Sequence, residues 1–148
     1  MNMRVLARLL LCSAFTLPLF AGGDLFEGRV IEVKSGAVVM VETDAARYEV
    51  KIIGIVPPAR EGSSASRARE RVSTLVMGKL IRVRYFRRDR DGTMVGQIYV
   101  GDPGIDVGIE LLKAGLVRKQ PEFDFPKGEL AAAERQARRA KRGLWAGQ

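Results

Sequence analysis

Short runs in which apolar and polar residues alternate dominate the first half of the chain. Residues 28–33 (GRVIEV) and 37–42 (AVVMVE) are two such runs, joined by a turn of three residues, and residues 48–53 (YEVKII) form a third. Alternation with a period of two is typical of strands with one buried face, and a short polar connection is typical of a hairpin. The pattern therefore predicts three sequential antiparallel strands.

The apolar period changes after the two prolines at positions 57 and 58. Within residues 61–79 apolar residues recur every three or four positions, serines offer N-terminal caps, and Gly78 suits the position just past a helix end. Alternation returns in residues 80–86 (LIRVRYF) and 93–100 (TMVGQIYV). We therefore expect a helix and then two more strands around a charged turn.

Two further helices are predicted in the last third of the chain. Asp106 can cap a short helix that ends at Gly115, and a longer helix covers about residues 129–142. A helix inserted after the third of five strands is the layout of a Greek-key barrel. We therefore predict an α+β protein, a five-stranded OB-fold Greek-key β-barrel with three helices.

The first 23 residues differ from the rest of the chain. They combine Arg4 and Arg8 with an apolar run over residues 9–20 and small residues at 21–23. This three-part pattern is typical of a secretory signal, and the apolar run is too short for a comfortable membrane span. We expect cleavage before Asp24, a mature domain of residues 24–148 without a stable membrane span, and a periplasmic or secreted location. Retention of the segment as an anchor is the alternative.

Two chemically distinctive residue types are missing from the predicted mature domain. Cys12 lies within the apolar run of the signal segment, and the sequence contains no histidine. These absences exclude a disulfide within the mature domain, histidine-based metal sites, Ser-His and Cys-His catalytic pairs, and a histidine general base.

The chain is basic, with a formal net charge of +8, and without Arg4 and Arg8 it keeps 23 basic against 17 acidic residues. A basic exported domain favours polyanionic partners such as nucleic acid, acidic lipid or acidic polysaccharide. The same charge also promotes solubility, so it does not identify a partner by itself.

Five sequence blocks occur in an order that resembles the staphylococcal-nuclease (thermonuclease-like) family across residues 24–145. They are GRVIEVKSGAVVMV, YEVKIIGIVPPA, RDRDGTMVGQIYV, DVGIELLKAGLV and ELAAAERQARRAKRGLW. One block alone is a weak signal, whereas five in order with compatible spacing are a strong signal for the fold. For active members, the resemblance implies hydrolysis of phosphodiesters with Ca²⁺.

The sequence departs from the family pattern at each position that carries this chemistry. The resemblance implies two calcium-binding aspartates, a glutamate that activates water and two arginines that clamp the phosphate. The matching positions carry Ala37 and Val56, then Ala59, then Lys51 and Thr93. Ca²⁺ takes roughly six to eight oxygen ligands, and a general base contributes about 10²–10⁴-fold to a rate. We therefore predict no catalytic residue, no metal and no cofactor, with Ca²⁺ required only if the domain is an active nuclease.

Nearby charged residues are the available substitutes for the missing groups. Glu61 lies two residues beyond the lost glutamate, Glu32, Glu42 and Asp44 flank the first hairpin, and Arg60 or Arg90 could reach a phosphate. We favour the interpretation that these side chains are simply solvated charges, because a displaced carboxylate rarely preserves the geometry of a metal site.

Arginines and one phenylalanine are the candidate nucleic-acid-binding residues. The strand at 80–86 and the turn after it supply one group, the polar face of the last helix supplies another, and Phe123 matches a family tyrosine near the bound nucleotide. The candidates are Arg82, Arg84, Arg87, Arg88, Arg90, Phe123, Arg135, Arg138, Arg139 and Arg142. Such residues are typical of sequence-independent binding. Solvated arginines and a phenylalanine that pins the linker to the core are the alternative, and Trp145 is expected to be part of the core.

Three functions are consistent with these observations. The first is an exported, catalytically inactive nuclease-like domain that binds nucleic acid or another polyanion weakly and without sequence preference. The second is a divergent calcium-dependent endonuclease acting on DNA or RNA. The third is a protein-interaction module with a protein partner on the same scaffold. We favour the first function, because this sequence keeps more of the family's binding features than of its catalytic residues.

Overall fold

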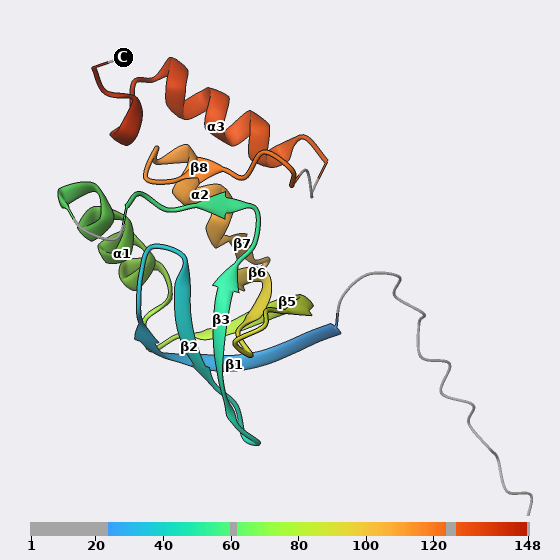
Figure 1. Cartoon of the computed structure of the whole chain (residues 1–148). Coiled ribbons are helices and arrows are strands. Elements are labelled where there is room, and N and C mark those ends of the chain that lie inside the picture. Colours follow the sequence, from blue (N-terminus) through green and yellow to red (C-terminus); the bar gives the residue numbers. More distant parts are fainter. Residues whose placement is uncertain (1–23, 60–61, 124–126, 148) are drawn as a thin grey trace, which may run out of the picture.

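Three antiparallel strands follow one another at the start of the domain, as the alternating pattern predicts. The computed structural model describes residues 24–59, 62–123 and 127–147 (Figure 1). Strands β1 (Asp24–Val33), β2 (Val38–Glu42) and β3 (Arg47–Ile52) pair in sequence. The predicted start of the first strand at residue 28 is wrong, because β1 is already paired with a later strand from Asp24 onward.

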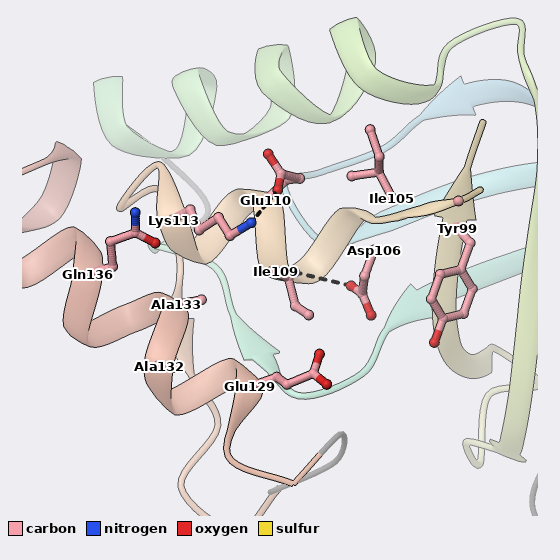
Figure 2. Close-up of a pocket in the computed structure, with 11 residues that line it drawn as sticks. Tyr99, Ile105, Asp106, Ile109, Glu110, Lys113, Glu129, Ala132, Ala133 and Gln136 are labelled. Carbon is pink, nitrogen blue, oxygen red and sulfur yellow. Dashed lines mark hydrogen bonds and ion pairs between the residues drawn. The ribbon is translucent and has the colours of Figure 1, made fainter. Parts of the chain in front are cut away.

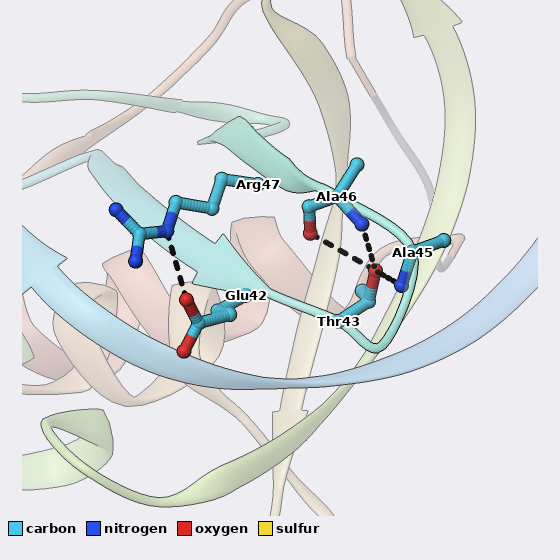
Figure 3. Close-up of polar contacts among 5 residues, drawn as sticks. All are labelled: Glu42, Thr43, Ala45, Ala46 and Arg47. Carbon is cyan, nitrogen blue, oxygen red and sulfur yellow. Dashed lines mark hydrogen bonds and ion pairs between the residues drawn. The ribbon is translucent and has the colours of Figure 1, made fainter.

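The turn between β2 and β3 is held by one threonine and one ion pair (Figure 3). Thr43 Oγ1 accepts hydrogen bonds from the N–H groups of Ala45 and Ala46, at 3.3 and 3.1 Å, and donates to the Ala46 carbonyl at 3.0 Å. Arg47 Nε donates to Glu42 Oε1 at 2.8 Å. Both charged side chains are largely exposed, so this pair has little effect on stability.

Strands β5 (Leu80–Arg88) and β6 (Met94–Val100) complete a closed five-stranded barrel. The strand order is β3-β2-β1-β5-β6, and β3 closes the barrel by pairing in parallel with β6. Strand β1 pairs with β5 along its first part and with β2 along its second. Gly28 lies where these pairings meet, and a Cβ there would be only 2.5 Å from Val41 Cγ1. The predicted OB-type barrel is therefore confirmed.

The barrel interior is filled by the inward-facing side chains of its strands. They are mostly β-branched, which suits the pleated surface of a sheet. The fully buried ones include Val30, Val39, Val41, Val50, Ile52, Ile81, Val83 and Ile98.

Helix α1 (Ser63–Val76) connects the short strand β4 (Ile55–Val56) to β5. The predicted serine cap is wrong, because Gly62 occupies the cap position and no side chain caps the helix. At the other end Gly78 has a φ of +71°, which confirms the predicted glycine just past the helix end.

The last two long helices form a layer over one end of the barrel. Helix α2 (Val107–Lys113) follows β7 (Ile105–Asp106) and packs against β6, and α3 (Glu129–Arg139) packs on α2 (Figure 1). Strand β8 (Arg118–Lys119) pairs with β4. Strands β4, β7 and β8 were not predicted, because two residues are too few to show a period.

The chain leaves α3 earlier than the predicted residue 142. The helix ends at Arg139, and a 3₁₀ turn follows at Gly143–Trp145. The Leu144 N–H donates to the Gly115 carbonyl at 2.8 Å, which ties the end of the chain to the end of α2. In the part of the chain that the structure describes, no helix is long and apolar enough to cross a membrane.

Candidate functional site

A cavity of about 660 Å³ lies between the β1–β2 turn, β3, the loop after β4, the start of α1 and the β5–β6 turn. The first of these turns is fixed by its own backbone, since the Lys34 and Ser35 N–H groups both donate to the Val38 carbonyl, at 2.9 and 3.2 Å. The cavity is lined by Lys34, Ser35, Gly36, Ala37, Val38, Glu49, Lys51, Pro57, Pro58, Ala65, Ser66, Arg69, Asp89, Asp91 and Thr93. The fold therefore gathers segments that lie far apart in the sequence.

Three of the five positions that the family resemblance marks as catalytic line this cavity, namely Ala37, Lys51 and Thr93. The other two, Val56 and Ala59, are not among the lining residues, and Val56 is 44% exposed. The marked positions on the cavity wall thus present an ammonium, a hydroxyl and a methyl group.

None of the described residues that the sequence analysis named as substitutes lines this cavity. Glu61 and Arg60 lie outside the described residues. Glu32, Glu42 and Asp44 do not line the cavity.

Glu49 is a cavity carboxylate that the sequence analysis did not assign. Lys34 Nζ forms an ion pair with it, and Thr93 Oγ1 donates to Glu49 Oε1 at 3.5 Å. The hydrogen bond to Glu49 raises the pKa of Lys34, so the ammonium is held in its charged form. Glu49 lies two positions before Lys51 on the same face of β3, so strand alternation could have placed it beside that candidate.

Two further carboxylates line the cavity from the β5–β6 turn. Asp89 pairs with Arg87, and Asp91 Oδ1 accepts from the Thr93 N–H at 3.1 Å, a hydrogen bond that lowers the pKa of Asp91. Across residues 24–59, 62–123 and 127–147, no three His, Cys, Asp or Glu residues are grouped so that they could hold a metal ion. The donor set at this cavity therefore does not fit Ca²⁺, which needs several oxygen ligands converging on one point.

A second cavity, of about 700 Å³, lies where β6 and β7 meet α2 and α3 (Figure 2). Its carboxylates are Asp106, Glu110 and Glu129, and Glu110 Oε1 pairs with Lys113 at 3.0 Å. Asp106 caps α2 by accepting from the Ile109 N–H at 3.1 Å, as predicted, and accepts from Gln97 Nε2 at 3.1 Å. Because its charge is negative and two of its carboxylates have structural partners, this cavity does not suit a polyanion.

We expect Asp106→Asn to stabilise the protein at neutral pH. Burial raises the pKa of Asp106, so the native state binds this proton more tightly than the unfolded state. The wild-type protein therefore loses stability as the pH rises from the ordinary aspartate pKa, about 3.9, through the raised value. Asparagine caps a helix about as well as aspartate and has no charge to desolvate, whereas Asp106→Ala should cost about 1 kcal/mol.

Urea unfolding of the wild type and of the Asp106→Asn variant, below the ordinary aspartate pKa and at neutral pH, measures this effect. The two stabilities should be nearly equal in acid, and the variant should be the more stable at neutral pH. A variant that is less stable at neutral pH would contradict the prediction.

The predicted arginine group on β5 is largely engaged by the protein itself. Arg82 Nη2 donates to the carbonyls of Gly101 and Pro103, both at 3.1 Å. The guanidinium of Arg84 lies 5.7 Å from the centroid of the Phe86 ring. The two Arg82 hydrogen bonds use part of the donor capacity that binding would need.

The same self-contact continues through the end of β5 into the turn after it. Arg87 pairs with Asp89, and Arg88 lies over the Tyr48 ring at 6.0 Å. Arg90 is exposed. Most of this group therefore has partners within the barrel.

The arginines of the last helix face solvent, as its amphipathic pattern predicts. Helix α3 buries Leu130, Ala133 and Ala137, and its candidate arginines Arg135, Arg138 and Arg139 are exposed. Arg142 lies beyond the helix end, is also exposed, and donates through Nη1 to the Lys113 carbonyl at 3.3 Å. Because α2 lies between α3 and the barrel, these arginines and those of β5 lie on different layers of the domain (Figure 1).

Phe123 is half-buried and packs against the barrel core. A Cβ added at Gly54 would lie 2.5 Å from Phe123 Cδ1, so the glycine makes room for the ring. This packing pins the linker before α3, and the role of Phe123 in binding stays a prediction.

Comparison with known proteins supports the likeness seen in the sequence. The family model described as "Staphylococcal nuclease homologue" matches residues 37–147. The "Uncharacterized endonuclease" of Escherichia coli O157:H7 is 30% identical over 118 residues, which cover 80% of this chain and 76% of that protein. The "Staphylococcal-like nuclease CAN1" of Arabidopsis thaliana is 32% identical over 105 residues, which cover 71% of this chain and 32% of that protein. The family match includes most of the residues around the first cavity and all of α3.

Proposed function

The chain belongs to the staphylococcal nuclease homologue family, and on this basis we propose that it is a nuclease-like domain that binds nucleic acid without hydrolysing it. The observation that carries the proposal is the cavity between the β1–β2 turn and the loop after β4. Its carboxylates are engaged by Lys34, by Arg87 and by the Thr93 N–H, and in the described residues they do not converge on a metal position. A phosphodiester bound there would meet no metal ligand set, and each of these carboxylates already has a partner.

Binding is supported by the distribution of charge on α3. Its arginines are exposed on the face opposite the buried stripe, and an arginine guanidinium donates to a phosphate through a planar fork. Contacts of this kind carry no sequence information. The ligand class is therefore a nucleic-acid backbone, bound without sequence preference.

A divergent calcium-dependent endonuclease is the second candidate function. The observation in its favour is that Glu49, Asp89 and Asp91 line the same cavity as Lys51. Two relatives also carry the names endonuclease and nuclease. Activity would require these carboxylates to leave their present partners.

A cleavage assay and a binding assay on the same preparation test the proposal. Single- and double-stranded DNA and RNA should remain uncut with Ca²⁺ as with EDTA, and they should bind with an affinity that falls with salt, with a logarithmic slope of about 0.7–0.9 per phosphate neutralised. EDTA-sensitive cleavage would establish the second candidate. Absence of binding at low salt, or indifference to charge reversal of Arg135, Arg138 and Arg139, would favour a protein-interaction module.

Export completes the proposal. The basic, apolar and small-residue segments of residues 1–23 support a cleaved signal. Protein isolated from its native host should have an intact mass that corresponds to a chain starting at or near Asp24. Full-length protein found in the cytoplasm would contradict export.

A further inference from the structure

Two arginines from different elements lie over the indole of Trp145. Arg138 of α3 places its guanidinium carbon 4.1 Å from the ring centroid, and Arg118 of β8 places its own at 5.3 Å. Trp145 is only 6% exposed, whereas both arginines are exposed. The indole is thus a fixed platform, and cation–π attraction within about 6 Å holds both guanidiniums on it.

We propose that Arg118 and Arg138 form a clamp on Trp145 that binds the phosphates of a nucleic-acid backbone. This inference rests on the proposed function and names the surface that performs it. A guanidinium that lies over an aromatic ring keeps the N–H groups at its edge, and these are the groups that grip a phosphate in bidentate fashion. Because both carbons lie within 5.3 Å of one centroid, the two forks can reach neighbouring phosphates of one strand.

Glu134 holds Arg138 in place and ties α3 to β8. Its Oε1 accepts from the Lys119 N–H at 2.9 Å, which ties α3 to β8, and its Oε2 accepts from Arg138 Nη2 at 3.2 Å. One edge of Arg138 is therefore used, and its other N–H groups remain for a ligand. For the Arg118 side chain, the described residues supply the indole contact and no hydrogen bond. The cluster of two arginines and one glutamate keeps a net positive charge.

Preorganisation explains why this pair should bind better than other exposed arginines. An arginine free in solvent loses rotamer freedom when it binds, whereas side chains already held on a buried ring have less freedom to lose. Arg135 and Arg139, exposed on the same helix, continue the positive charge along α3. Phosphates beyond the clamp would meet these two residues.

The test compares two double variants of the full chain in binding a fluorescently labelled oligothymidylate. Arg118→Ala with Arg138→Ala should weaken binding at low salt by at least about tenfold, because the variant loses two charge-assisted phosphate contacts. The salt slope should fall by about 0.7 for each phosphate that the variant no longer neutralises. The control, Arg29→Ala with Arg47→Ala, removes the same charge from exposed positions on β1 and β3 and should change affinity less than about threefold. Figure 3 shows Arg47. Equal decreases in both variants would overturn the clamp.

A charge-conserving variant separates the clamp from simple attraction. Arg118→Lys with Arg138→Lys keeps the charge and loses the planar forks, so the salt slope should persist while affinity falls. Wild-type affinity in this variant would also overturn the clamp. The exposure of both positions makes unfolding unexpected, and far-UV circular dichroism of every variant verifies this.

Tryptophan emission distinguishes failure of this inference from failure of the proposed function. Trp145 is the one tryptophan in the sequence, so its fluorescence reports on the clamp alone. Titration with inorganic tripolyphosphate should change this emission in the wild type and not in the double alanine variant. If tripolyphosphate changes the emission and no nucleic acid binds, the arginine pair is a phosphate site, and the proposed function fails together with the nucleic-acid ligand of the clamp. If nucleic acid binds with no change in Trp145 emission, the proposed function stands and the clamp fails.

Discussion

Five substitutions made together should give the domain calcium-dependent nuclease activity. They place carboxylates and guanidiniums at the positions that the family resemblance marks: Ala37→Asp, Lys51→Arg, Val56→Asp, Ala59→Glu and Thr93→Arg. We expect Ca²⁺-dependent cleavage at least about 10²-fold above the wild-type background, since a general base alone contributes about 10²–10⁴-fold. The measurement is the initial rate of DNA cleavage with Ca²⁺ and with EDTA.

The structure also predicts how this variant responds to calcium before any cleavage. Ala37 is 1% exposed, so an aspartate there is a buried charge that needs a partner. Val56 is 44% exposed and Ala59 is exposed, so carboxylates at these positions cost little. Calcium should therefore raise the thermal midpoint of the variant and leave that of the wild type unchanged.

A matched variant with Ala59→Gln in place of Ala59→Glu provides the control. It keeps both calcium-binding aspartates and lacks the base, so it should be stabilised by calcium and should not cleave. Robust EDTA-sensitive cleavage by the wild type would refute the prediction that the wild type does not cleave. Glu61 and Glu49 would then be the first carboxylates to replace.

Trp145→Ala should lower the free energy of unfolding by about 3–5 kcal/mol. The indole is buried at the 3₁₀ turn that ties the chain to the end of α2, and two guanidiniums cover it. Its removal leaves a cavity and releases both arginines. Since a domain of this size has only about 5–15 kcal/mol of stability, the decrease is severe.

Urea unfolding followed by far-UV circular dichroism measures this decrease, because the fluorescent probe is absent from the variant. Trp145→Phe keeps an aromatic platform and should be destabilised less. A decrease near the roughly 0.5 kcal/mol typical of surface substitutions would show that Trp145 is not part of the core.

Local pattern was enough to predict the elements of the barrel and several of their ends. Alternation placed the five long strands, and Gly78, Gly115 and Asp106 end or cap helices as expected. These features depend on residues close together in the chain, through backbone conformation and capping hydrogen bonds. The helical period alone did not predict the early end of α3. The segment after the helix is held by a hydrogen bond from the Leu144 N–H to the Gly115 carbonyl, which is distant in sequence.

The candidate site was only partly predictable for a related reason. The family resemblance implied which side chains are missing at Ala37, Val56 and Ala59, and the helical period predicted that the polar face of α3 is rich in arginine. The pairing of Glu49 with Lys34 and the meeting of Arg118 and Arg138 over Trp145 became visible only in the folded chain. Strand register and helix packing determine such partners, because they bring together residues far apart in the chain. The local period of apolar and polar residues contains no information about these contacts.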